Sequence, residues 1–179
     1  MKIGIFCSAN SQIDPDFFTL PRQLGEWIGQ HQHTLVYGGT DLGLMDCIAH
    51  AVADNGGRVV GMVPSLLLKN EHANPIDHER YLCTTLSERK QLMTQHSDVF
   101  IALPGGIGTL DEVFSVAGEG TLAYHDKRVI MYSMKGFWDH LENLFCHLQQ
   151  EGFLRGDYRQ RIAFAHNLEE IISYLNFGD

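Results

Sequence analysis

Short apolar runs alternate along the chain with longer segments in which apolar residues recur at helical spacing. Several runs are nearly continuous in Ile, Val, Phe and Ala, a pattern typical of strands that helices cover on both faces. The runs predict strands at residues 2–6, 34–37, 58–63, 98–103, 128–133 and 162–165. The helical spacing predicts helices at residues 14–31, 44–55, 86–96, 109–123, 137–151 and 168–176.

This alternation predicts a three-layer α/β fold: a doubly wound (Rossmann-like), mostly parallel sheet with helices on both faces. The chain has 179 residues, 44% of them hydrophobic, and the sequence contains no repeat or linker. We therefore expect residues 1–179 to form a single domain with a substantial core. Pro21 lies inside the first helical segment and predicts a kink or a later start. Residues 64–78 are polar and irregular, which marks them as a candidate functional loop.

Charge and cysteine content narrow the class of protein. The formal net charge is −9, which argues against a broad nucleic-acid surface but allows a small anion to be held locally. The four cysteines form no CxxC pair, and no histidine spacing resembles a metal site, so we expect reduced cysteines and no metal. The sequence shows neither a signal-peptide pattern nor an apolar run of membrane-spanning length. We therefore expect a cytoplasmic protein with no membrane or nucleic-acid partner.

Three unusual turns follow predicted strands, where a parallel sheet binds its ligands. The first is the small, polar turn at residues 7–10, and the other two are glycine-rich turns at residues 38–45 and 103–112. Neither glycine-rich turn has the spacing of a dinucleotide fingerprint or the Lys and Ser/Thr of a P-loop. A nicotinamide enzyme and an NTPase are therefore disfavoured.

The turn at residues 103–112 nevertheless has the properties of an anion site. Its glycines, Gly105, Gly106 and Gly108, let the backbone approach a phosphate closely. We expect Thr109 to be the N-cap of the next helix, whose dipole would then point at the same place. The alternative is a tight turn that merely needs glycine. Three glycines and a threonine at a strand–helix junction favour a phosphate site.

Polar side chains near this turn each allow two interpretations. Glu112 could complete a capping box with Thr109, or it could enter the cleft to stabilise a cationic ribose or activate a water. Arg89 and Lys90 oppose the dipole of the helix predicted at residues 86–96, so they would form either a solvated pair or a site for an anion. Met93, on the same helix, could pack against a base or simply fill the core.

Two motifs together resemble the Lonely Guy (LOG) family. They are RKxxM at Arg89, Lys90 and Met93, and PGGxGTxxE at residues 104–112. The similarity extends to residues 36–45, 60–64, 125–127 and 151–153, and so covers nearly the whole chain. It implies hydrolysis of the N-glycosidic bond of a nucleoside 5′-monophosphate, either AMP or a cytokinin riboside 5′-monophosphate, to free base and ribose 5-phosphate. It also implies a homodimer and no cofactor.

The resemblance assigns roles to individual residues. It implies that Arg89 and Glu112 are the catalytic pair. The substrate-binding residues it implies are Ser8, Gly39, Glu71, Lys90, Met93, Gly105, Gly106, Ile107, Gly108 and Thr109. This sequence departs from the family pattern at Gly118 and Glu119, where the family has Thr and Trp, and so the preferred base stays open.

Two other functions compete with hydrolysis. The same scaffold could serve as a non-catalytic protein that binds or carries a nucleotide or a phosphorylated pterin cofactor. It could also bind single-stranded DNA, although the acidic composition weighs against this. A carboxylate beside an anion site favours the enzyme, because phosphate binding alone needs no carboxylate.

Overall fold

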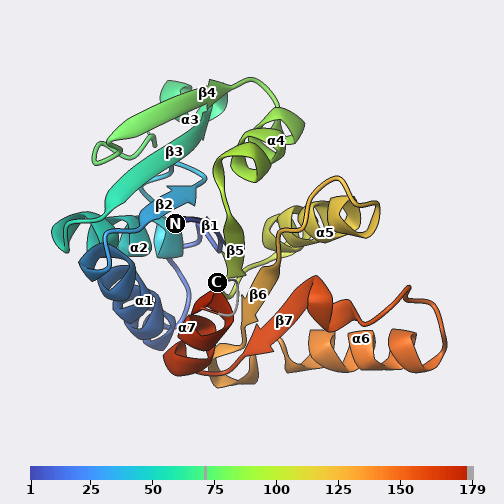
Figure 1. Ribbon diagram of the computed structural model, residues 1–179. Helices are drawn as coiled ribbons and strands as arrows, with labels where there is room; N and C mark the ends of the chain where they lie inside the picture. The colour runs from blue at the N-terminus through green and yellow to red at the C-terminus, as the bar shows by residue number, and fades with distance from the viewer. Residues whose placement is uncertain (71, 177–179) are drawn as a thin grey trace.

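The computed structural model describes residues 1–70 and 72–176, and its centre is a parallel β-sheet (Figure 1). Within these residues the sheet has seven strands in the order β4-β3-β2-β1-β5-β6-β7, and every neighbouring pair is parallel. The strands are β1 (Lys2–Phe6), β2 (Thr34–Tyr37), β3 (Arg58–Pro64), β4 (Glu79–Cys83), β5 (Val99–Ala102), β6 (Val129–Tyr132) and β7 (Ile162–Ala165). The predicted doubly wound α/β fold is confirmed.

Helices cover both faces of the sheet, and their bounds are close to those that the helical spacing predicts. They are α1 (Thr19–Gln30), α2 (Gly43–Asp54), α3 (Ser65–Lys69), α4 (Leu86–His96), α5 (Ile107–Thr121), α6 (Asp139–Gln150) and α7 (Leu168–Asn176). Short 3₁₀ turns lie at η1 (Pro15–Phe18), η2 (Met134–Gly136) and η3 (Tyr158–Gln160). In the part of the chain that is described, no helix has both the length and the apolar character needed to cross a bilayer.

Two hydrophobic cores, one on each face, hold the three layers together. Helices α1, α2 and α7 bury Leu24, Ile48 and Ile171 against one face of the sheet. Helices α4, α5 and α6 bury apolar side chains, Val113 and Phe145 among them, against the other face (Figure 1). Because both faces are covered, the inner strands are apolar at nearly every position, which is the pattern that revealed them in the sequence.

Strand β4 was not predicted, because it lies at the edge of the sheet. Its burial alternates, and its sequence, Glu-Arg-Tyr-Leu-Cys, lacks a continuous apolar run. Glu79 forms an ion pair with Arg58 of β3 at 2.7 Å, a charged contact suited to a solvent-facing edge. The loop expected at residues 64–78 also contains regular structure, since α3 occupies its first part.

The first helical segment begins later than residue 14, as Pro21 suggested it could. The 3₁₀ turn η1 precedes α1, and α1 begins at Thr19. Pro21 therefore lies in the first turn of α1, where a missing N–H removes no helical hydrogen bond. This placement accommodates the proline without a kink inside the helix.

The order of the strands reverses between β1 and β5. The chain proceeds outward from β1 to β4, then returns to the other side of β1 and proceeds outward again from β5 to β7. The connections after β1 and β5 lead to helices on opposite faces of the sheet, and a doubly wound sheet of this kind has its crevice at the carboxyl ends of these two strands. This crevice is where a doubly wound sheet places a ligand.

Candidate active site

The three turns singled out in the sequence meet at this crevice, and Ser8 joins them. The Ser8 N–H donates to the carbonyl of Pro104, in the turn after β5, at 3.1 Å. The Ser8 carbonyl accepts from the N–H of Leu44, at the start of α2, at 3.0 Å. Gly43 approaches the same turn so closely, with φ of +59°, that a Cβ there would lie 2.6 Å from the Ala9 carbonyl carbon. A side chain at this glycine would push the turns apart.

The turn after β5 leads directly into α5, and the helix begins two residues earlier than expected. Gly106, not Thr109, is the N-cap, and it has no side chain with which to cap the helix. The expectation of an N-cap at Thr109 was therefore wrong, because the helix has already begun at Ile107 when the chain reaches Thr109. Thr109 is buried in the first turn, where its hydroxyl packs against Gly105.

The amino end of α5 is open to solvent. A Cβ added at Gly106 or at Gly108 would meet no atom within 4 Å, and Ile107 between them is 87% exposed. The first N–H groups of an α-helix have no partner inside the helix, and the helix dipole makes this end positive. The turn therefore presents free N–H groups and space to an anion.

Arg89 and Glu112 form a buried ion pair beside this helix end. Arg89 Nη2 of α4 lies 2.5 Å from Glu112 Oε1 of α5, and the two side chains are 15% and 4% exposed. Glu112 does not form the capping box with Thr109, because the helix has already begun at Ile107 and the carboxylate turns toward Arg89. That interpretation of residues 109–112 was wrong.

Burial dominates the electrostatics of Glu112. Removal from water raises the pKa of Glu112, while the charge and hydrogen bond of Arg89 act in the opposite direction. Burial, and next the charge of Glu112, raise the pKa of the Cys7 thiol, so Cys7 at the end of β1 belongs to the surroundings of this carboxylate. Sequence reasoning missed Cys7, since a lone buried cysteine after a strand carries no signal of its own.

Lys90 and Met93 occupy the same helix as Arg89 but have different surroundings. Lys90 Nζ lies 2.9 Å from both carboxylate oxygens of Asp111 and 2.9 Å from Ser115 Oγ, so it crosslinks α4 and α5. Glu112 and Asp111 of α5 thus compensate the charges of Arg89 and Lys90. The interpretation of Arg89 as part of a solvated surface pair was wrong, because its side chain is mostly buried. Met93 is buried in the core, as the core-packing interpretation predicts, and its contact with a base stays a prediction.

The glycine loop after β2 forms the wall behind Arg89. A Cβ at Gly38 would lie 3.5 Å from Arg89 Nη1, and Gly39 has φ of +74° with Val63 Cγ2 only 2.5 Å from a Cβ position. Gly38 was not predicted as a site residue, because nothing in the sequence distinguishes it from its neighbour Gly39 or shows that it lies beside Arg89. The remaining predicted contact, Glu71, lies outside the described residues.

A second hollow, away from the amino end of α5, has the wrong chemistry for a phosphate. A groove of about 530 Å³ runs between α1 and α2, and it is lined by Glu26, Asp41, Asp46 and Asp54 with Arg22 as its one arginine. This acidic lining would repel a phosphate. Across the residues with described side chains, no three His, Cys, Asp or Glu groups are placed to share a metal ion.

Solved structures with the same fold include molybdenum cofactor proteins. The molybdenum cofactor binding protein of Rippkaea orientalis has a TM-score of 0.74 and 21% sequence identity, and the match covers 98% of this chain and 95% of that one. The Moco carrier protein of Chlamydomonas reinhardtii has a TM-score of 0.74 at 20% identity, with the same shares of each chain covered. At this identity the likeness establishes the fold.

Sequence relatives identify the family. The family described as "Possible lysine decarboxylase" matches residues 45–175. A probable cytokinin riboside 5′-monophosphate phosphoribohydrolase of Oryza sativa subsp. japonica is 36% identical over 96% of this chain and 77% of its own length. The cytokinin riboside 5′-monophosphate phosphoribohydrolase of Mycobacterium marinum is 32% identical over 95% of this chain and 90% of its own length. The family match and the alignments with these two relatives each span most of the chain. This protein therefore belongs to the Lonely Guy (LOG) family.

Proposed function

We propose that this protein is an N-glycosidase that hydrolyses a nucleoside 5′-monophosphate to free base and ribose 5-phosphate. The observation that carries the proposal is the buried Arg89–Glu112 pair beside the open amino end of α5. The phosphoribohydrolase names of relatives that match nearly the whole chain support the same reaction. AMP and cytokinin riboside 5′-monophosphates are the substrates we propose.

The turn at residues 105–109 holds the 5′-phosphate in this proposal. The free N–H groups of Ile107, Gly108 and Thr109 donate to phosphate oxygens, and Gly106 leaves room for them. Glu112 follows Gly108 by four residues, so the two positions lie on one face of α5. A nucleotide anchored by its phosphate would therefore set its ribose against Glu112.

The chemical step uses the carboxylate of Glu112. As the C1′–N bond breaks, positive charge develops on the ribose, and Glu112 stabilises it or orients the attacking water. The water oxygen bonds to C1′, one of its protons is released, and the departing base takes up a proton. Arg89 orients Glu112. Arg89 Nε is also buried without a hydrogen-bond partner among the described residues, a strained condition that functional sites tolerate.

The direct test is to incubate the protein with AMP and measure adenine and ribose 5-phosphate. We expect both products in equal amounts, and none from adenosine, which lacks the phosphate. Glu112→Gln should lower kcat by about 100-fold or more while KM changes little, because the lost carboxylate acts in the transition state.

Glu142→Gln, a matched change on α6 away from the crevice, is the control and should leave the rate unchanged. Full turnover by Glu112→Gln would refute the catalytic role. A wild-type protein that releases no ribose 5-phosphate from any nucleoside monophosphate would refute the function.

The second candidate is a carrier of a phosphorylated cofactor, since the proteins of known structure that share this fold include a molybdenum cofactor binding protein and a Moco carrier protein. The same turn could hold such a ligand, but a buried carboxylate beside an anion has no use in simple carriage. Saturable binding without any product would identify a carrier. Equal amounts of base and sugar phosphate identify the enzyme.

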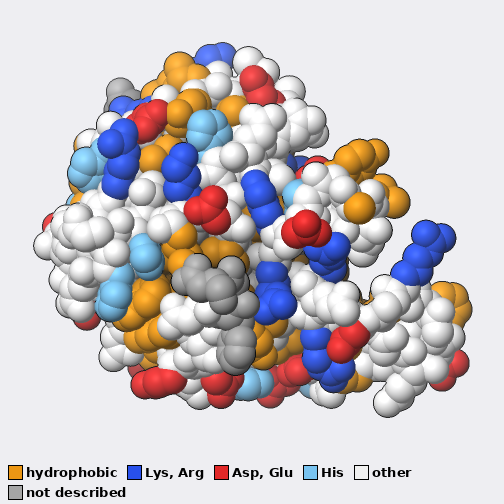
Figure 2. All heavy atoms as spheres, viewed as in Figure 1, with side chains coloured by type: hydrophobic (Ala, Val, Ile, Leu, Met, Phe, Trp, Pro, Cys, Tyr) orange, Lys and Arg blue, Asp and Glu red, His pale blue; other side chains and the backbone are white. Residues whose placement is uncertain are grey.

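We also propose a homodimer that forms through α5. Phe114 in this helix, and Leu122 and Tyr124 just beyond its end, are exposed large hydrophobic residues. A groove of about 340 Å³, lined by Phe145, Leu154 and others, runs between α5 and the segment from α6 to β7. Figure 2 shows hydrophobic side chains over the outer end of α5 and a hollow between α5 and α6. An exposed apolar face beside a groove is typical of a protein interface.

We propose the cytoplasm as its location and no nucleic acid as a partner. All four cysteines are free thiols, as is usual for cytosolic proteins. The net charge is −9, and on the face drawn in Figure 2 basic side chains are interspersed with acidic ones. Such a surface favours a small anion held locally over an extended polyanion.

A further inference from the structure

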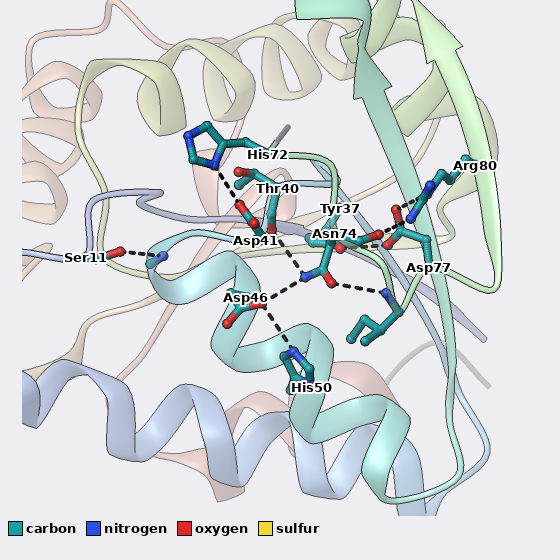
Figure 3. A network of polar contacts seen from close by, with 12 residues as sticks. Ser11, Tyr37, Thr40, Asp41, Asp46, His50, His72, Asn74, Asp77 and Arg80 are labelled. Carbon is teal, nitrogen blue, oxygen red and sulfur yellow. Dashed lines mark hydrogen bonds and ion pairs between the residues drawn. The ribbon is translucent and has the colours of Figure 1, made fainter. Parts of the chain in front are cut away.

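A short segment after α3 is laid along the glycine loop that follows β2 (Figure 3). We call residues 72–74 the strap. Thr40 and Ala73 form an antiparallel bridge, the Asp41 N–H donates to the His72 carbonyl at 3.2 Å, and the Asn74 N–H donates to the Gly39 carbonyl at 2.9 Å. The strap thus supplies the backbone partners that the glycine loop, which lies beyond the end of its strand, would otherwise lack.

Asn74 fastens the strap to two other elements through its side chain. It is fully buried. Its Nδ2 donates to Asp46 Oδ1 of α2 at 3.0 Å and to the Thr40 carbonyl at 3.4 Å, and its Oδ1 accepts from the Ile76 N–H at 3.2 Å. Only an amide offers both donors and an acceptor in this space. Figure 3 shows Asn74 between the glycine loop and α2, with Asp46 extending the network to His50.

The position of the glycine loop matters to the proposed catalytic pair. Gly38 lies against the guanidinium of Arg89, and Gly39 is held in a left-handed conformation against Val63. Asn74 hydrogen-bonds to the next two residues of the same loop, Gly39 and Thr40. A displacement of the loop would therefore move the wall that packs on Arg89.

We propose that Asn74 is a positioning residue for the nucleotide site: it clamps the glycine loop between the strap and α2 and so sets the cleft beside Arg89. The inference rests on the proposed function and adds a residue to it. Asn74 does not touch the reacting atoms. We expect its effect on substrate binding, because Gly39 of the clamped loop is a predicted substrate-binding residue, whereas the Arg89–Glu112 ion pair joins α4 and α5 directly.

The test exchanges the donor and acceptor of the buried hydrogen bond. Asn74→Asp removes the donor and places a second carboxylate against Asp46. We expect the KM for AMP to rise by about tenfold with kcat within about threefold, the scale of one lost buried hydrogen bond. The double variant Asn74→Asp with Asp46→Asn restores the bond between positions 74 and 46 in the reverse direction, while the longer bond to the Thr40 carbonyl stays lost. Because the shorter bond is the one restored, KM should return to within about threefold of wild type.

Asn55→Asp is the matched control, because it makes the same chemical change at the other end of α2 and should leave KM unchanged. Amide hydrogen exchange at Gly39, Thr40 and Asp41 should be faster in Asn74→Asp and recover in the double variant. An unchanged KM in Asn74→Asp, or a double variant that restores the melting temperature but not KM, would overturn the proposal.

The same variants separate this inference from the proposed function. If wild-type protein binds AMP without cleaving it, hydrolysis has failed, and the Kd for AMP measured by calorimetry replaces KM in the comparison. A Kd that rises in Asn74→Asp and recovers in the double variant still supports the positioning role. A Kd that is equal in all the variants refutes it.

Discussion

At the scale of single residues, the feature that decides the chemistry is a carboxylate removed from water. Glu112 is nearly fully buried, and Arg89 alone pairs with it among the hydrogen bonds of the described chain. Burial makes the charged form of Glu112 costly and raises its pKa, while the charge and the hydrogen bond of Arg89 stabilise the charged form. A charge held in this way, without water around it, acts strongly on a cation that develops nearby.

The raised pKa of Glu112 predicts the acid side of the pH–rate profile. Below its folded-state pKa, Glu112 is protonated and can neither stabilise the ribosyl cation nor orient water, so kcat/KM should fall as pH falls. The midpoint of this decline should lie above 4.5, the ordinary value for a glutamate. Initial rates with AMP between pH 4 and pH 8 check this, roughly spanning the range in which a shifted carboxyl titrates.

Two controls accompany the profile. The residual activity of Glu112→Gln should have lost this acid limb. The Glu112 carboxyl ¹³C shift, followed by NMR in the free protein, should titrate with the same midpoint. A titration at or below the ordinary value would contradict the raised pKa.

At the scale of elements, α5 begins at Ile107, before the predicted Thr109, and two of the residues at its amino end are glycines without side chains. Gly106 caps the helix without a side chain, and the helix reaches Glu112 after one and a half turns. Nothing around Gly106 or Gly108 fills the space above the first turn. The element therefore supplies N–H groups, room and a carboxylate from one continuous stretch of chain.

Gly106→Ala tests this element without strain on the fold. Gly106 has φ of −98°, outside the left-handed region, and its Cβ would meet no atom, so the melting temperature should stay unchanged. The added methyl group occupies the phosphate space, and the KM for AMP should rise by about tenfold or more. Thermal melting and steady-state kinetics measure the two effects separately.

Thr121→Ala, at the far end of the same helix, is the control. The Thr121 side chain is exposed and its hydroxyl donates only to the Gly118 carbonyl, so its loss should leave the KM for AMP unchanged. Equal KM values for Gly106→Ala and wild type would contradict the phosphate site.

At the scale of the whole molecule, two faces of the sheet serve different purposes. Helices α1, α2 and α7 close one face around a compact core. On the other face, α5 and α6 leave an apolar groove and exposed aromatic side chains between them. The crevice at the switch point and this groove both include α5, so the proposed dimer interface and the proposed catalytic site share one helix.

The proposed dimer predicts that Phe114→Asp will sediment as a monomer. Phe114 is 44% exposed, so a charge there should cost the isolated fold little, while it would be buried without a partner in an interface. Sedimentation equilibrium of wild-type and variant protein measures the mass. Leu66→Asp on α3, another exposed apolar position, is the control and should remain dimeric. A wild-type mass of one chain would contradict the proposal.

The sequence predicted what depends on local pattern. Buried inner strands such as β1 and β5 are nearly continuous apolar runs, so the fold class and the positions of the turns that follow these strands were predicted correctly. The edge strand β4 was missed because it lies at the solvent-facing edge of the sheet and its burial alternates, and its first two residues, Glu79 and Arg80, are charged. The start of α5 was placed at Thr109 because a threonine followed by Glu112 resembles a capping box, whereas glycine capped the helix earlier.

By itself, the sequence determined the parallel α/β architecture, the glycine turns at the ends of β2 and β5, and the presence of Arg89 and Glu112 on two different helices. Only the tertiary structure decided what those side chains contact. Their pairing, the burial of Met93 and the clamp made by Asn74 join residues distant in the sequence. Backbone patterns are set by neighbours along the chain, but contacts and charge states depend on which elements the fold brings together.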